Sequence, residues 1–125
     1  MKHNVMLTTA SLLSILLVTF HLADDIVRGM EPGTLPDLAG VLILVVWLFA
    51  TLVLAERRSG YVIVLLGSLL GAAVPVFHMK GAGVGEIAKS SGGFFFVWTL
   101  LALGVTALLS VILSVRGLWR LRRAG

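Results

Sequence analysis

Four long, mainly apolar segments alternate with short polar connections along the chain. They run over Val5–Ala23, Leu38–Ala55, Tyr61–Phe77 and Phe94–Val115. Each is close to the ~20 residues that a helix needs to cross about 30 Å of hydrocarbon. Their apolar residues are continuous, without the alternation of a barrel strand, and an open sheet cannot satisfy its edges in lipid. The pattern predicts an all-α membrane protein with four transmembrane helices.

The connections predict how these helices are arranged. The stretch "ERRSG" between the second and third segments is short enough to force an antiparallel hairpin, which favours an up-down bundle. With their polar ends included, the spans are expected over residues 5–28, 38–55, 61–80 and 94–115, followed by a basic cytoplasmic tail over 116–125. All four belong to one domain, 1–125. The first segment is too long for a signal peptide and lacks a cleavage motif, so we expect it to remain as a span.

Composition supports a protein built for lipid. Hydrophobic residues make up 58% of the chain and charged residues 13%, against roughly 25% charged in soluble domains. The absence of cysteine excludes disulfides and thiolate metal sites. The net charge of +4 comes largely from the C-terminal end. We interpret it as a signal of membrane topology and expect no nucleic-acid partner.

Lysine and arginine counts predict the orientation, because these residues accumulate in cytoplasmic connections. Three basic residues fall on one side of the predicted membrane: Arg28, Lys80 and Lys89. Seven fall on the other: Lys2, Arg57, Arg58, Arg116, Arg120, Arg122 and Arg123. The imbalance predicts a protein of the bacterial inner (cytoplasmic) membrane with both termini in the cytoplasm.

A weak internal echo links the two halves of the chain. The dipeptide Phe-His occurs at positions 20–21 and 77–78, and Val-Trp at 46–47 and 97–98. The echo favours two repeated helical hairpins arranged in parallel. Trp47 and Trp98 lie near the middle of their spans, away from the interface where tryptophan is common. We expect them to pack in the core, with the wall of a cofactor site as the alternative.

Two helices carry a distinctive face. On the first, Ser11, Ser14, His21 and Asp25 recur with the helical period and should look into the bundle, because polar groups are disfavoured against lipid. On the third, a face with Gly67, Gly71, Pro75 and His78 contains a GxxxG motif that permits close helix packing. This packing is expected within the bundle or between subunits of a homo-oligomer, with a ligand groove as the alternative.

The candidate site consists of His21, Asp24, Asp25 and His78, which should lie at similar depth near the extracytoplasmic face. Imidazole and carboxylate together suit divalent metals such as Zn, Cu(II), Ni or Mn. His21 and His78 alone could ligate a b-type haem. A third interpretation is a proton relay in a small proton-coupled transporter.

A plainer interpretation needs no ligand. Asp24 and Asp25 lie four and three residues before Arg28, at spacings that permit ordinary helix ion pairs worth a few tenths of a kcal/mol. The sequence therefore predicts a small, non-enzymatic integral membrane protein with a His/Asp ligand site. It would act as a homo-oligomer or as an accessory subunit of a larger complex; a membrane redox protein and a transporter are the alternatives.

The C-terminal segment predicts a lipid contact. Arg116, Trp119, Arg120, Arg122 and Arg123 gather where the last span meets the inner leaflet. Cationic side chains beside an interfacial tryptophan favour anionic lipid headgroups. We expect this segment to anchor the chain in the bilayer.

Overall fold

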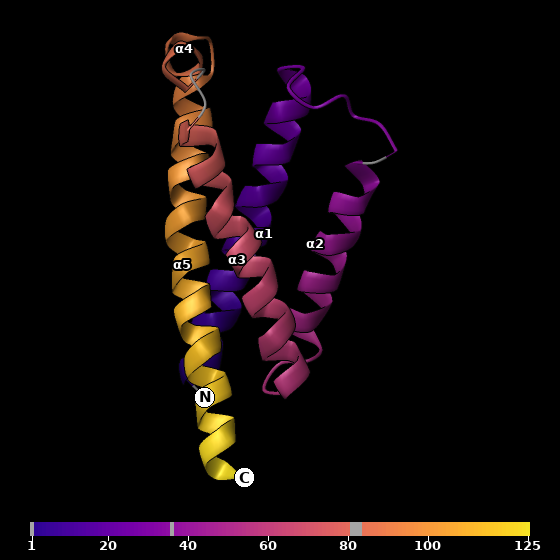
Figure 1. Cartoon of the computed structure of the whole chain (residues 1–125), viewed down its shortest axis with the longest axis vertical. Coiled ribbons are helices and arrows are strands. Elements are labelled where there is room, and N and C mark those ends of the chain that lie inside the picture. The colour runs from indigo at the N-terminus through magenta and orange to yellow at the C-terminus, as the bar shows by residue number, and fades with distance from the viewer. Residues whose placement is uncertain (1, 36, 81–83) are drawn as a thin grey trace.

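The computed structural model describes residues 2–35, 37–80 and 84–125, and this part of the chain is entirely helical apart from its turns and connections (Figure 1). Its helices are α1 (Lys2–Val27), α2 (Asp37–Leu52), α3 (Arg58–Lys80), α4 (Val84–Lys89) and α5 (Gly93–Ala124). The predicted all-α class is confirmed. Among the described helices, α1, α3 and α5 are long and apolar enough to cross a membrane, whereas α2 is a shorter apolar helix.

Two helix ends differ from the prediction. The second span was expected to reach residue 55, but α2 ends at Leu52 and the chain turns through Glu56, whose φ is +67°. The expected basic tail over 116–125 is instead the last part of α5, which continues to Ala124. Arginine and leucine are good helix formers and no proline interrupts the segment, so nothing local ends the helix at residue 115.

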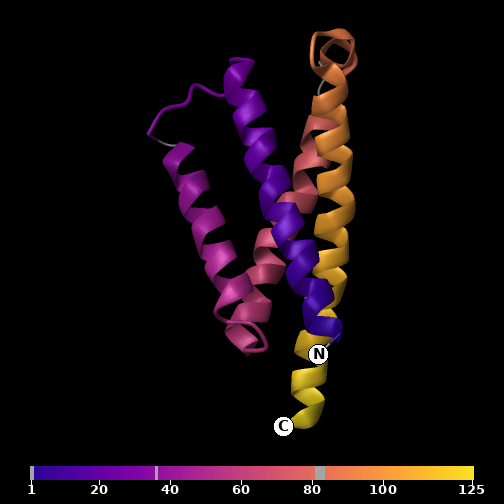
Figure 2. The same cartoon turned by 180° about the vertical axis from the view of Figure 1, so that it is seen from behind.

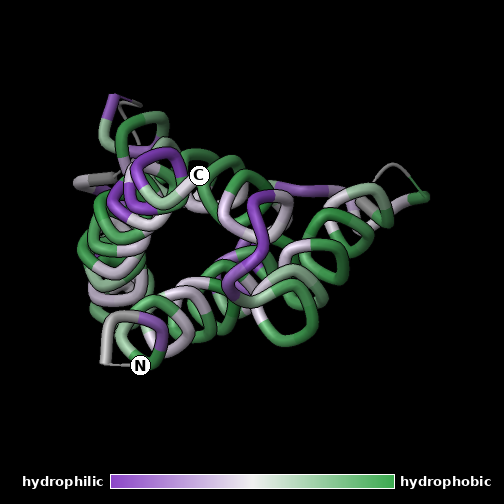
Figure 3. Tube along the Cα trace, turned by 90° about the horizontal axis from the view of Figure 1, so that it is seen from below, coloured by the Kyte–Doolittle hydropathy of each residue, from purple (hydrophilic) through white to green (hydrophobic). Residues whose placement is uncertain are grey.

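The long helices form a bundle in which α5 packs against α1 and α3, while α2 leans on α3 at one end and diverges at the other (Figures 1 and 2). The start of α1 and the end of α5 lie at the same end of the bundle (Figure 1). Hydrophilic residues gather at helix ends and connections, and the helix middles are largely hydrophobic (Figure 3). Such a surface is suited to contact with lipid.

Trp47 of α2 is buried against α1 and α3. It is only 2% exposed, and its Nε1 donates a hydrogen bond of 2.8 Å to Ser11 Oγ. Ser11 Oγ also lies 2.7 Å from Thr51 Oγ1. The indole lies on α3 at Gly67, where an added Cβ would stand 2.5 Å from Trp47 Cδ2. The predicted core position of Trp47 is confirmed.

The same fit supports the first of the two arrangements expected for the glycine face of α3, namely packing within the bundle. Gly67 is covered by Trp47, and Gly71 lies against Trp47, Ala107 and Leu103. The close packing therefore occurs within one chain. The expected homo-oligomer stays a prediction.

Trp98 differs from the prediction. It is 63% exposed and stacks on Phe94 with ring centroids 6.0 Å apart. α5 turns other residues inward, among them Phe96, Leu100 and Leu103, which are at most 2% exposed. The expected core position of Trp98 is wrong, and the echo between Trp47 and Trp98 in sequence does not extend to their surroundings.

Candidate metal centre

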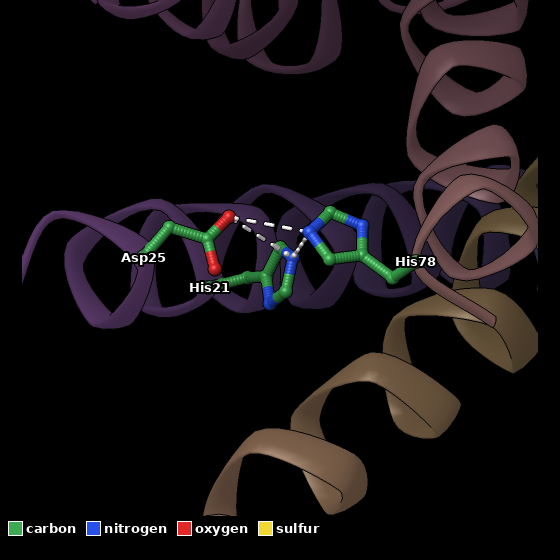
Figure 4. A group of neighbouring side chains, drawn as sticks. All are labelled: His21, Asp25 and His78. Carbon is green, nitrogen blue, oxygen red and sulfur yellow. Dashed lines mark hydrogen bonds and ion pairs between the residues drawn. The ribbon is translucent and has the colours of Figure 1, made fainter. Parts of the chain in front are cut away.

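The polar face of α1 is buried, as its periodicity predicts. Ser11 and Ser14 are fully buried, and His21 and Asp25 are 4% and 6% exposed. Asp25 follows His21 by four residues, so their side chains lie one helical turn apart on the same face. His78, in the last turn of α3, reaches toward this pair (Figure 4). The two histidines of the repeated Phe-His dipeptide therefore lie in one site.

Three ligand atoms meet at the centre of this group. His21 Nε2 lies 3.2 Å from His78 Nε2, Asp25 Oδ2 lies 3.5 Å from His21 Nε2, and the same oxygen lies 3.4 Å from His78 Nε2. The atoms form a nearly equilateral triangle, drawn by the dashed lines in Figure 4. Residues of this type at this spacing can hold a metal ion.

The hydrogen bond on the far side of His78 orients its ring. His78 Nδ1 lies 2.9 Å from the carbonyl oxygen of Val74, one turn earlier in α3. Because a carbonyl only accepts, Nδ1 must carry the hydrogen. Nε2 of the neutral ring then presents a lone pair toward Asp25 and His21, as a metal-binding imidazole does.

The group contains several buried polar atoms, and among the described residues no positive charge offsets the carboxylate of Asp25. In addition to the three converging atoms, His21 Nδ1 and Asp25 Oδ1 are buried without a hydrogen-bond partner in the described part of the chain. The fully buried Phe96 covers both imidazoles, with ring centroids 5.2 Å from His21 and 5.8 Å from His78. A buried carboxylate is costly unless a positive charge compensates it. A cation shared by the three side chains would supply that charge.

Asp24 does not belong to this group, contrary to the prediction. Its Oδ2 accepts a hydrogen bond of 2.7 Å from Arg28 Nε, which confirms the plainer interpretation for this one acid. Arg28 also donates to Ser90 Oγ at 3.0 Å, and its guanidinium carbon lies 5.5 Å from the centre of the Phe96 ring. Arg28 therefore connects the end of α1 to Ser90 and to the ring of Phe96, which packs on the two imidazoles of the site.

Sequence reasoning missed two contributors to the site. Phe96 lies in a continuous aromatic and apolar stretch, "FFFVW", where nothing distinguishes the inward ring from its neighbours. Val74 acts through its backbone carbonyl, which side-chain chemistry cannot reveal. Pro75, the next residue, was a local signal that this part of α3 is unusual.

The two imidazoles are not arranged for a haem. Their ring centroids are 4.5 Å apart and the rings meet edge to face. Two histidines on opposite faces of a haem iron place their nitrogens roughly 4 Å apart, twice a metal–nitrogen bond of about 2 Å, with a porphyrin between them. At 3.2 Å the Nε2 atoms are too close, and Asp25 occupies part of the space. The geometry argues against the alternative in which His21 and His78 ligate a b-type haem.

No protein-family model, curated protein or solved structure matches this chain. A function must therefore be argued from the chemistry of the site itself.

Proposed function

We propose that this protein is an integral membrane protein that binds a divalent transition metal through His21, Asp25 and His78. The supporting observation is the triangle of ligand atoms, whose edges are 3.2, 3.4 and 3.5 Å. Three ligands about 2.0–2.1 Å from a tetrahedral zinc ion are separated by ~3.3–3.4 Å. The three distances therefore fit those between three corners of such a tetrahedron.

The ligand set narrows the choice of metal. Two imidazoles and one carboxylate suit Zn²⁺, and the same set binds Fe²⁺ in many oxygenases; Cu(I) prefers sulfur. Octahedral neighbours at these bond lengths would stand about 2.9–3.0 Å apart, which is shorter than the observed edges. We therefore favour Zn²⁺. Three protein ligands leave a fourth position open, as in zinc sites that bind an exchangeable molecule.

One observation supports a second candidate function, proton binding. A single hydrogen on His21 Nε2 would bridge to the lone pair of His78 Nε2 across 3.2 Å, and a further proton would neutralise Asp25. A small proton-coupled transporter would use such a group. This candidate needs no metal, so metal titration separates the two.

A cobalt titration of the purified full chain tests the metal site. We expect one Co²⁺ per chain with the visible spectrum of a four-coordinate ion, displaced by Zn²⁺. His78→Ala should weaken binding by at least about 100-fold, since even groups that only support a ligand are worth 10–100-fold.

His3→Ala is the matched control, because residue 3 lies roughly 27 Å from residue 21 along α1, and it should leave the affinity unchanged. If the wild-type protein binds neither ion while the imidazoles of His21 and His78 titrate together by NMR, the proton-binding proposal replaces the metal proposal.

The proposed setting is a single domain with four spans, in which α2 crosses beside the three longer helices and both termini are cytoplasmic. The arginine imbalance supports this orientation. At the proposed inner end, the guanidinium carbon of Arg123 lies 4.0 Å from the centre of the Trp119 ring, as expected for side chains that share the headgroup region. Together with Arg116, Arg120 and Arg122 they would bind anionic lipid.

Reporter fusions test this topology. A cytoplasm-active reporter at Gly125 should be active, and one inserted in the turn at Arg57 should also be active, because α2 and α3 form a hairpin there. A reporter inserted after Glu86 in α4 should be active only when it is of the externally active type. External activity at Gly125 would contradict the orientation.

A further inference from the structure

An apolar cavity of about 250 Å³ begins at the three proposed ligands and extends between α1, α2 and α3. Apart from His21, Asp25 and His78, its wall consists of glycine and apolar side chains such as Val18, Leu22, Leu44 and Val74. The wall also includes Trp47, whose only polar atom is already bonded to Ser11. The cavity thus has one polar end and an apolar body.

This cavity continues onto the outer surface of the bundle. A groove of about 330 Å³ along α2 and α3 shares Ile43, Trp47, Gly67 and Leu70 with the cavity. The remaining residues of the groove are apolar too: Leu42, Val46, Ile63 and Leu66. Leu70 is 56% exposed and Ile43 48% exposed, so the mouth between them opens toward the lipid-facing side.

We propose that the site takes a single-chain carboxylate, whose head ligates the open position of the metal and whose chain lies in the cavity. This inference rests on the metal site proposed above. A divalent ion held by one carboxylate and two neutral imidazoles keeps one positive charge. A monoanionic head neutralises it, which matters in a site shielded from water.

The direction of the cavity matches the way such a molecule lies in a bilayer. The ligands stand near the ends of their helices, because α1 ends at Val27 and α3 at Lys80. From His78 to Gly67, both in the cavity wall, α3 runs about 16 Å toward its middle. A fatty carboxylate in a bilayer likewise holds its head at the interface and its chain toward the bilayer centre. It can therefore enter the cavity from the side without reversing its orientation in the membrane.

The volume sets the length of the chain. At roughly 30 Å³ per non-hydrogen atom, the share of a water molecule in the liquid, 250 Å³ holds about eight atoms. A carboxylate of about six carbons, with its two oxygens, therefore fills the cavity, and a longer chain such as that of decanoate would continue into the groove. Decanoate is a suitable probe, and acetate is the matching head without a chain.

The test uses the Co²⁺-loaded full chain in phosphatidylcholine nanodiscs, with the visible spectrum as the readout of head ligation. Decanoate should change the spectrum with at least tenfold tighter binding than acetate. Decyltrimethylammonium, which has the same chain and no oxygen head, should leave the spectrum unchanged. Leu70→Trp should weaken decanoate binding at least fivefold while Co²⁺ and acetate affinities stay the same.

Leu69→Trp is the matched control, since Leu69 is 48% exposed on α3 and lines neither the cavity nor the groove. Decanoate partitions into the bilayer equally for both variants, so the comparison of Leu70→Trp with Leu69→Trp is free of that effect. Decanoate that binds no tighter than acetate, or an equal effect of the two tryptophan variants, would overturn the carboxylate proposal and leave the metal site intact. Failure of the wild type to bind Co²⁺ would overturn both.

Discussion

Asp25→Asn should lower the Zn²⁺ affinity of the protein by at least about 100-fold, equivalent to ~2.7 kcal/mol, whereas Asp24→Asn should change it less than about threefold. The two acids are adjacent in sequence, and each substitution removes one negative charge. Only Asp25 Oδ2 stands within 3.5 Å of both His21 Nε2 and His78 Nε2. An amide oxygen at that position is neutral and a much weaker metal ligand.

The control acts on a different contact. Asp24 is bonded to Arg28, so Asp24→Asn loosens the end of α1 by up to about 1 kcal/mol without removing a proposed ligand. Competition with a fluorescent zinc chelator measures both affinities, and circular dichroism checks that both variants stay helical. Equal losses would indicate that local charge, and not ligation by Asp25, controls binding.

This pair of acids also shows how far the sequence predicts the site. The helical period alone aligns Asp25 with His21, Ser11 and Ser14, and that face is buried. Asp24 is expected in the site from its similar depth, but depth alone does not bring side chains together, because one residue turns a helix by about 100°. Its pairing with Arg28 follows from the i,i+4 spacing. The position of His78 beside His21 depends on tertiary packing, and the repeated Phe-His dipeptide was its only signal.

The positions of the helices were predictable, and the rotation of α5 could have been predicted too. Continuous apolar runs predict the positions of α1, α3 and α5, because lipid requires a long apolar helix. Within α5, the hydroxyl residues Thr99, Ser110 and Ser114 recur with the helical period on one face, and all three are buried. Trp98 is adjacent to Thr99 and is therefore turned away from that face by about 100°. Its expected core position overlooked this polar face, which is the same kind of signal that orients α1.

Trp47→Ala should lower the free energy of unfolding by about 3 kcal/mol, at the lower end of the range for buried tryptophans. The lower end applies because the lipid or detergent around the denatured helices is as apolar as the core. Moving the indole out of the core therefore costs little hydrophobic free energy, and most of the loss comes from its van der Waals contacts. The variant would leave a void above Gly67, where the indole now fits. It also removes the hydrogen bond to Ser11 Oγ, worth about 1 kcal/mol.

Trp98→Ala is the same substitution at the other Val-Trp position, and it should change the stability by no more than about 0.5 kcal/mol. Trp98 is 63% exposed, and its stacking partner Phe94 lies on the same helix, so its removal opens no space between helices. Denaturation in mixed detergent micelles, followed by circular dichroism, compares the two variants under one condition. Similar losses of stability would mean that α2 does not insert Trp47 between α1 and α3, and the wall of the proposed cavity would then be wrong as well.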